Sequence, residues 1–141
     1  MIKRSLWIVS IILILAGVMA MSFDNRSFHY ENELEESIKR GKDVYMNTCL
    51  TCHMENGEGI TGVFPPLAKS DYLMEDTKRS IRVLIYGANS EMEVNGTIYN
   101  GSMDATGLND QEISDVLNYI RNSWGNKGGI VRPEDVGQER E

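Results

Sequence analysis

Two cysteines and a histidine are the residues of this chain best suited to chemistry. Cys49 and Cys52 stand three positions apart, and His53 follows at once. This Cys-x-x-Cys-His spacing is the attachment signature of a c-type haem. Each thiol can add across one vinyl group of the haem to form a thioether, and the histidine then lies under the iron as an axial ligand. The chain has only these 2 cysteines, so both are committed to one site.

Two other interpretations of these residues fit less well. A structural zinc site needs four ligands, usually as two separated pairs, whereas His29 is the only other histidine and Cys52 adjoins His53. A thioredoxin-like redox pair needs a strand before the motif and a helix that opens at it. Here the motif closes a helical stretch instead. We therefore predict one covalent haem c with its iron.

The second axial ligand is sought among the methionines that follow the motif. Met54 adjoins His53 and cannot reach the opposite face of the haem. Met74 falls in a predicted short helix, where methionine usually fills the core. Met92 lies between two glutamates, in a setting we expect to be polar and exposed. Met103 lies in a glycine-containing loop before the last helix and is the predicted ligand. Met92, or an iron without a second protein ligand, stays open.

Apolar residues at helical spacing predict the first helix over residues 32–48, with Asn32 as its cap. Gly41 lies in the interior of this helix, where glycine costs about 1 kcal/mol relative to alanine. A glycine is best explained there by another helix that presses closely on it. Residues 24–31 show no clear period and are predicted to be a linker.

The remainder of the chain contains two further strong helical patterns. Residues 77–86 form one, and residues 110–124 form the other, behind a capping box at its start. The stretches between the helices are rich in glycine and proline, and no strand pattern is evident. We expect an all-α domain over residues 32–126, in which about three helices and long loops wrap the haem. Residues 127–141 are polar and are predicted to be a loose tail.

The beginning of the chain has the composition of an export segment. Lys3 and Arg4 form a basic start, and residues 6–21 are almost wholly apolar. Residues 1–23 are either a signal peptide cleaved after Ala20 or a retained membrane anchor. In both cases we expect export to the periplasmic side of the cytoplasmic membrane, with the domain soluble or anchored.

The length of 141 residues is typical of one domain, and the formal net charge is −7. Such a charge disfavours binding to nucleic acid and to anionic lipid. It favours a protein partner with a basic docking face, because charge steers association.

In this order the motifs resemble a class I monohaem cytochrome c of the bacterial type. The resemblance covers residues 34–125. After the haem motif come Phe-Pro-Pro-Leu at residues 64–67, Asn-Gly-Thr-Ile-Tyr-Asn-Gly-Ser-Met at residues 95–103, and the last helix. The resemblance implies the all-α cytochrome c fold, with three to four helices and one covalent haem.

The resemblance also implies a complete haem site. His53 and Met103 would be the axial ligands of the iron. The carbonyl of Pro65 would accept a hydrogen bond from the other ring nitrogen of His53, which fixes the ring, and Leu67 would pack on the haem. The residues implied to bind the cofactor are therefore Cys49, Cys52, His53, Met103, Pro65 and Leu67.

One position departs from the family pattern. The family usually has proline directly after the ligand methionine, and this chain has Asp104. Proline would stiffen the loop by fixing a backbone angle. The departure therefore bears on the strength of the Met103–iron bond and on the reduction potential.

The function implied by the resemblance is electron transfer, with the haem iron cycling between Fe(II) and Fe(III) under His/Met ligation. The chain would not be an enzyme itself and would exchange electrons with a redox protein donor and acceptor. Two alternatives stay open. One is a haem subunit of a larger dehydrogenase or reductase. The other is a ligand-binding or catalytic haem protein in which Met103 is a labile ligand.

Overall fold

The computed structural model describes residues 29–140. The chain divides into two compact units, residues 1–34 and 35–141, and the second contains the predicted haem motif. The predicted export segment and most of the predicted linker lie outside the described residues. Among the described residues, no helix combines the length and the apolar character needed to cross a membrane.

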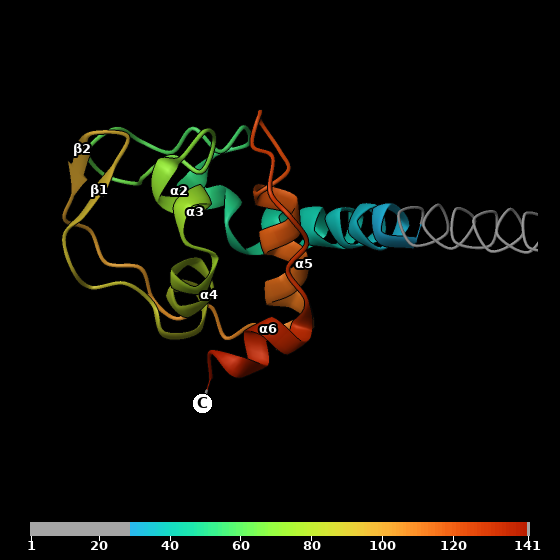
Figure 1. Ribbon diagram of the computed structural model, residues 1–141. Helices are drawn as coiled ribbons and strands as arrows, with labels where there is room; N and C mark the ends of the chain where they lie inside the picture. Colours follow the sequence, from blue (N-terminus) through green and yellow to red (C-terminus); the bar gives the residue numbers. More distant parts are fainter. Residues whose placement is uncertain (1–28, 141) are drawn as a thin grey trace, which may run out of the picture. The chain divides into compact units, whose positions relative to one another are not determined.

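The N-terminal helix runs over residues 29–48 of the described chain. It passes through Asn32 without a break, so the prediction of a cap there is wrong, and residues 29–31 of the predicted linker are helical. The predicted close contact at Gly41 is confirmed: a Cβ added at this residue would lie 1.9 Å from the carbonyl oxygen of Asp115. Figure 1 shows this helix crossing α5, which is Asp110–Ile120.

Helix α5 begins at the predicted capping box. The side chain of Asn109 accepts from the backbone N–H of Glu112 at 3.0 Å, and the Glu112 carboxylate accepts from the backbone N–H of Asn109 at 2.9 Å. The helix ends at Ile120 rather than at Trp124, because the chain turns over residues 121–125. Trp124 itself has a positive φ of 53°, which no α-helix accommodates.

Two helices match the sequence predictions: α3 (Asp71–Glu75), where a short helix was predicted around Met74, and α4 (Thr77–Tyr86). A third short helix, α2 (Leu50–His53), covers the haem motif and was not predicted as a separate element. Asp76 caps α4 by accepting from the backbone N–H of Arg79 at 3.0 Å. Gly87 ends α4 with φ 81°, a conformation that glycine adopts without strain.

The predicted absence of strands is wrong. An antiparallel hairpin pairs β1 (Met92–Val94) with β2 (Thr97–Tyr99), and Figure 1 shows it beyond α3 and α4. Asn95 and Gly96 connect the strands with φ values of 51° and 75°, as a type I′ turn requires. Each strand has only three residues, too few for an alternating pattern to stand out in the sequence.

The predicted loose tail is also wrong. Residues Pro133–Gln138 form helix α6, and Val131 and Val136 are 3% and 0% exposed. These valines join the main core with α4, α5 and the N-terminal helix. The polar composition of this stretch concealed two well-placed apolar residues. The all-α class is nonetheless confirmed, with the small hairpin as an addition.

Candidate haem site

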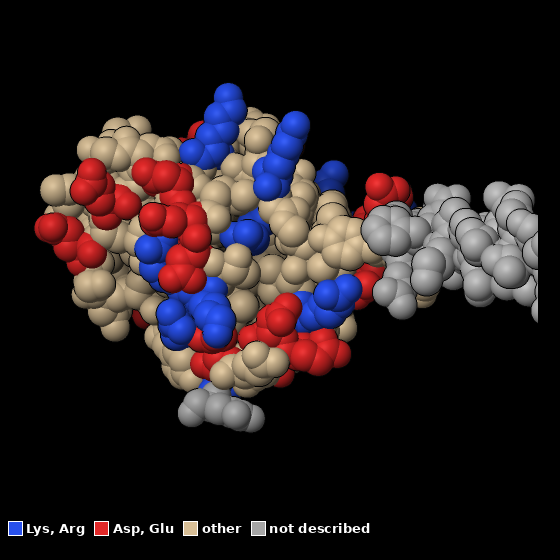
Figure 2. Space-filling view, in the orientation of Figure 1, with Lys and Arg blue, Asp and Glu red and all other residues tan. Residues whose placement is uncertain are grey.

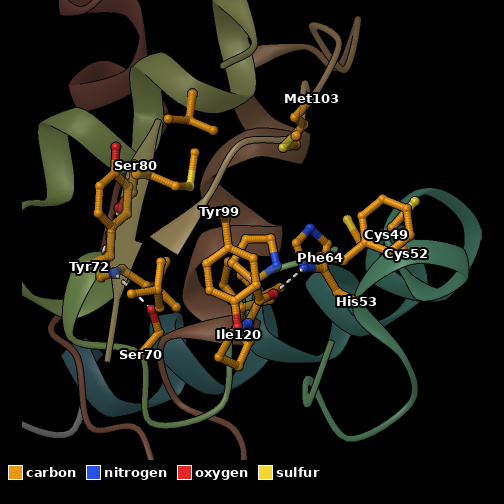
Figure 3. Close-up of a pocket in the computed structure, with 18 of the residues that line it drawn as sticks. Cys49, Cys52, His53, Phe64, Ser70, Tyr72, Ser80, Tyr99, Met103 and Ile120 are labelled. Carbon is orange, nitrogen blue, oxygen red and sulfur yellow. Dashed lines mark hydrogen bonds between the residues drawn. The ribbon is translucent and has the colours of Figure 1, made fainter. Parts of the chain in front are cut away.

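A cavity of about 300 Å³ lies within the second unit, and its wall is mostly apolar. Segments from α2, α4, α5, the hairpin and the adjoining loops contribute to this wall, as Figure 3 shows. Protein interiors are close-packed and hold few voids larger than a water molecule. A cavity of this size matches the lower end of the range for sites that hold a cofactor or ligand.

The three residues of the haem motif lie together on the cavity wall. One helical turn brings them there: the backbone N–H of His53 donates to the carbonyl of Cys49 at 3.0 Å. Cys49 and Cys52 are free thiols of intermediate exposure. The Cys-x-x-Cys-His spacing therefore places both thiols and the imidazole at one apolar cavity.

His53 is oriented by Pro65. Its Nδ1 lies 3.0 Å from the Pro65 carbonyl oxygen, and Figure 3 draws this bond as a dashed line. Because a carbonyl only accepts, Nδ1 carries the proton and Nε2 keeps its lone pair. Burial lowers the pKa of His53, while the bond to Pro65 acts in the opposite direction. The neutral imidazole is the form that binds a metal.

Met103 lines the same cavity, and Figure 3 places it across the open space from His53. Two backbone hydrogen bonds of 2.8 Å pair Met103 with Ala88, directly after the end of α4. Gly87 permits this approach, because a Cβ there would lie 2.4 Å from the Met103 carbonyl oxygen. The structure thus brings the two predicted axial ligands to one site.

Met92 is not the exposed residue that its neighbours suggested. Strand β1 alternates, so Glu93 points to solvent while Met92 is half-buried and Val94 is buried. Met92 lies on the cavity wall. The sequence argument against it as a ligand therefore loses its basis, and a direct test is needed to separate Met92 from Met103.

The loop between α2 and α3 supplies the remaining predicted residues. Pro65 and Leu67 both line the cavity. The loop is folded tightly, because the backbone N–H of Leu67 donates to the carbonyl of Gly57 at 2.7 Å. A Cβ on Gly59 would lie 2.4 Å from the carbonyl oxygen of Phe64. Glycine is therefore what lets this loop form the wall.

The chemistry of Cys49 favours a thioether over the two alternatives weighed from the sequence. Burial, assisted by the charge of Cys52, raises the pKa of the Cys49 thiol to about 11. A redox cysteine acts as a thiolate, and this raised pKa disfavours the thiolate form at neutral pH. Within residues 29–140, no three His, Cys, Asp or Glu side chains gather as a metal cluster. The donor set and the apolar wall fit a covalent haem.

An aromatic cluster behind the haem motif was not foreseen. The rings of Tyr45, Tyr119 and Trp124 lie 5.2 to 5.5 Å apart between centroids. The Tyr45 hydroxyl donates to the Met54 carbonyl at 2.6 Å, which holds the residue after His53. The apolar spacing of Tyr45 on its helix was the only available signal, and it indicated packing without revealing this bond.

Four further side chains of the cavity wall were also missed: Ser70, Tyr72, Ser80 and Tyr99. Recognition of the Asn-Gly turn at residues 95–96 would have predicted the hairpin and placed Tyr99. The other three come from α3, α4 and the residue before α3, and nothing local distinguishes them from surface positions.

Comparison with known proteins places this chain among the cytochromes c. A family model described as Cytochrome c matches residues 38–124. A cytochrome c-552 of Thermus thermophilus is 43% identical over 90 residues, which cover 60% of this chain and 68% of that protein. The cytochrome c subunit of a quinone alcohol dehydrogenase from Gluconobacter oxydans is 32% identical over 99 residues, covering 68% of this chain and 21% of that subunit. A gluconate 2-dehydrogenase cytochrome c subunit from Pantoea cypripedii is 28% identical over 123 residues, which cover 80% of this chain and 28% of that subunit.

The chain belongs to the cytochrome c family. It is a c-type cytochrome, for which the family implies covalent haem and iron, and its class of function is haem electron transfer rather than catalysis of its own. The match spans about two thirds of the Thermus protein and less than a third of either dehydrogenase subunit.

Proposed function

We propose that the second unit transfers single electrons through one haem c held in the described cavity. Cys49 and Cys52 would carry the thioethers, and His53 and Met103 would supply the two axial ligands. The haem would provide the Fe(II)/Fe(III) couple when bound. The observation that carries this proposal is the arrangement around one apolar cavity of both cysteine thiols, the oriented imidazole of His53 and the side chain of Met103.

The protein residues would keep the site closed and rigid. Pro65 holds the His53 ring through the 3.0 Å hydrogen bond, so the imidazole does not rotate between oxidation states. Leu67 and the other apolar side chains exclude water from the cavity. With His53 and Met103 both bound to the iron, no coordination position would remain for oxygen or a substrate, which suits electron transfer.

The optical spectrum of the holoprotein tests this assignment, with carbon monoxide added to the reduced form. A methionine–iron charge-transfer band in the oxidised protein, together with no response to carbon monoxide, supports the closed His/Met site. If the band is missing and carbon monoxide binds rapidly, the iron is open. The alternative function of ligand binding or catalysis would then replace electron transfer through a closed site.

The surface around the cavity supports a redox partner with a basic docking face. The segments that carry the haem motif and Met103, residues 43–68 and 83–120, contain no lysine or arginine. Their exposed carboxylates are Asp43, Glu55, Glu58, Glu91, Glu93 and Asp104. Figure 2 shows acidic side chains gathered at the end of the molecule where the hairpin lies. Charges of one sign around a site steer a partner of the opposite sign.

The centre of this surface is apolar. Val63 is 51% exposed and lines the cavity, and Ile60 on the same loop is 41% exposed. A Cβ on Gly101 would lie 3.3 Å from the Val63 carbonyl oxygen, so the two loops meet at the cavity wall. A small apolar contact with a charged rim suits a brief electron-transfer encounter.

Exchange rates with two small redox reagents test the charge argument. We expect hexaammineruthenium, a cation, to react faster than ferricyanide, an anion, after correction for driving force, and to slow as salt is added. Glu91→Gln with Glu93→Gln should reduce this difference, whereas Glu134→Gln on the exposed face of α6 should not. An equal effect of Glu134→Gln would show that net charge alone is responsible.

A subunit role in a larger oxidoreductase is the second candidate. Two relatives are named as cytochrome c subunits of dehydrogenases, which favours a dehydrogenase as the electron donor. Co-purification from solubilised membranes of the native source distinguishes the candidates. A stable complex with a dehydrogenase would support the subunit role, and isolation of the single chain would support a mobile carrier.

We further propose that the chain works on the periplasmic side of the cytoplasmic membrane. The composition of residues 1–23 supports export. Whether the domain is soluble or anchored depends on cleavage after Ala20. The mass of the mature protein separates these two forms, because only the uncleaved chain retains the apolar segment.

A further inference from the structure

The chain continues beyond residue 124, where the family match ends, into a C-terminal strap that we define as residues 131–140. Val131 and Val136 anchor this strap in the core. The side chain of Asn118 accepts from the backbone N–H of Val131 at 2.7 Å and donates to its carbonyl at 2.8 Å. The strap is therefore an integral part of the second unit, although the family match does not include it.

One end of the strap is clipped to α4. The Glu139 side chain is only 10% exposed and forms ion pairs with Arg82 and, at 3.3 Å, with Lys78. The Tyr86 hydroxyl lies 3.2 Å from the carbonyl oxygens of both Glu139 and Arg140 and donates toward them. These contacts involve the last two turns of α4 and its first turn. The strap therefore holds α4 along its length and up to its final residue.

The same end of the strap is also clipped to the start of α5. The guanidinium of Arg140 donates to the Asp110 carboxylate at 2.6 Å and to the carbonyl of Leu108 at 2.9 Å. A Cβ on Gly137 would lie 3.5 Å from the other Asp110 carboxylate oxygen, so α6 itself packs at this point. Figure 1 shows α6 beside the lower ends of α4 and α5.

The contacts of the strap with α4 and with the start of α5 lie at the two ends of one stretch of chain. The distal segment, which we define as residues 87–108, leaves α4, carries Met103 and enters α5. Within the segment, a backbone pair joins Ala88 to Met103. Two bonds from Thr106 to the Leu84 carbonyl, at 3.0 and 2.8 Å, attach the segment to α4, and a reciprocal pair between Asn95 and Asp71, at 3.1 and 2.8 Å, attaches the hairpin turn to α3. The strap adds a further connection, which ties the beginning of the segment to its end.

We propose that the C-terminal strap is a positioning device for the axial methionine. By joining α4 to the start of α5, Glu139 and Arg140 keep the ends of the distal segment together and so hold Met103 at the cavity. This inference rests on the proposed role of Met103 as a ligand. A neutral thioether on a loop is lost from its metal whenever the loop opens locally, and local opening depends on such peripheral contacts.

The test uses the holoprotein with the paired substitution Glu139→Gln and Arg140→Gln. The matched control is Arg40→Gln, which breaks another ion pair of α5: the Arg40 guanidinium bonds to Asp115 at 2.7 Å, on the face that the N-terminal helix covers. Three quantities are measured for each protein. They are the methionine–iron band, the rate of carbon monoxide binding to the reduced form, and the free energy of unfolding in urea.

We expect the strap variant to bind carbon monoxide about tenfold faster than the parent, because the population of opened distal segment rises. Arg40→Gln should leave this rate near the parent value even when it lowers the free energy of unfolding as much. If both variants change the rate equally at equal loss of stability, the strap merely stabilises the fold and the inference is overturned. If the parent itself lacks the methionine–iron band, the ligand assignment fails first, and the inference fails with it.

Discussion

Gly41 of the N-terminal helix packs so closely against Asp115 of α5 that residue 41 has no space for a Cβ atom. A Cβ on Gly41 would lie 1.9 Å from the Asp115 carbonyl oxygen and 2.9 Å from the Cβ of Tyr119. Next to this crossing, Asp115 accepts from the Ser37 hydroxyl at 2.6 Å and from Nε and Nη2 of the Arg40 guanidinium, both at 2.7 Å. The N-terminal helix, which leads into the haem motif, is thereby fixed against α5.

Gly41→Ala should lower the free energy of unfolding by about 1–3 kcal/mol, because the helices must move apart and their packing is lost. Urea unfolding of the holoprotein measures this change. Lys42→Ala is the matched control, since Lys42 is exposed on the same helix and its change should lie within about 0.5 kcal/mol. Equal stability of the two variants would contradict the close crossing.

Cys49→Ala and Cys52→Ala should each leave a single thioether, because the structure presents both thiols to one cavity. The pyridine haemochrome spectrum of each variant should shift away from that of the parent, in which we expect both vinyl groups to be saturated. Cys49→Ala with Cys52→Ala should release the haem on denaturation. Haem retained by the double variant after denaturation would show that these cysteines are not the attachment site.

Met103→Ala should abolish the methionine–iron band and open the reduced iron to carbon monoxide, because the second axial position loses its thioether. Met92→Ala is the critical comparison, since Met92 also lines the cavity. It should keep the band and remain closed to carbon monoxide. The reverse result, with the band lost only in Met92→Ala, would transfer the ligand role to Met92.

Val136→Ala should lower the free energy of unfolding by about 2 kcal/mol, because it leaves a space in the core where Val136 is 0% exposed. Ile98→Ala removes more apolar volume, yet Ile98 is 53% exposed, and its change should stay within about 0.5 kcal/mol. Unfolding followed by urea ranks the two. A Val136 variant as stable as the parent would mean that α6 does not belong to the core in solution.

Arg40→Gln should lower the free energy of unfolding by about 3 kcal/mol, because it leaves the carboxylate of Asp115 buried without its charge partner. Asp115 is 3% exposed, whereas the Arg40 side chain is 52% exposed and can hydrate when its partner is removed. Lys39→Gln is the control, because within the described residues Lys39 forms ion pairs with two exposed glutamates of its own helix, Glu35 and Glu36. A loss as small as that of Lys39→Gln would mean that water already reaches Asp115.

Much of the fold and the haem motif could be predicted because their signals are local. The Cys-x-x-Cys-His spacing specifies covalent attachment, whatever surrounds it. The cap of α4 at Asp76 and the capping box of α5 act within one helical turn. Glycine inside the first helix predicted a close contact for the reason that the structure shows. The family and the electron-transfer class followed from these motifs in their order along the chain.

Tertiary structure alone decided the features that depend on residues distant in sequence. The inward turn of Met92 depends on pairing with Tyr99, and the burial of Val131 on the side chain of Asn118. The ends of the distal segment are joined by Glu139 and Arg140, whose charges looked like an ordinary solvated tail. A chain specifies its covalent chemistry and its helical turns by neighbouring residues. Which polar stretches become packed is set by contacts across the fold, because burial is a property of the whole assembly of elements.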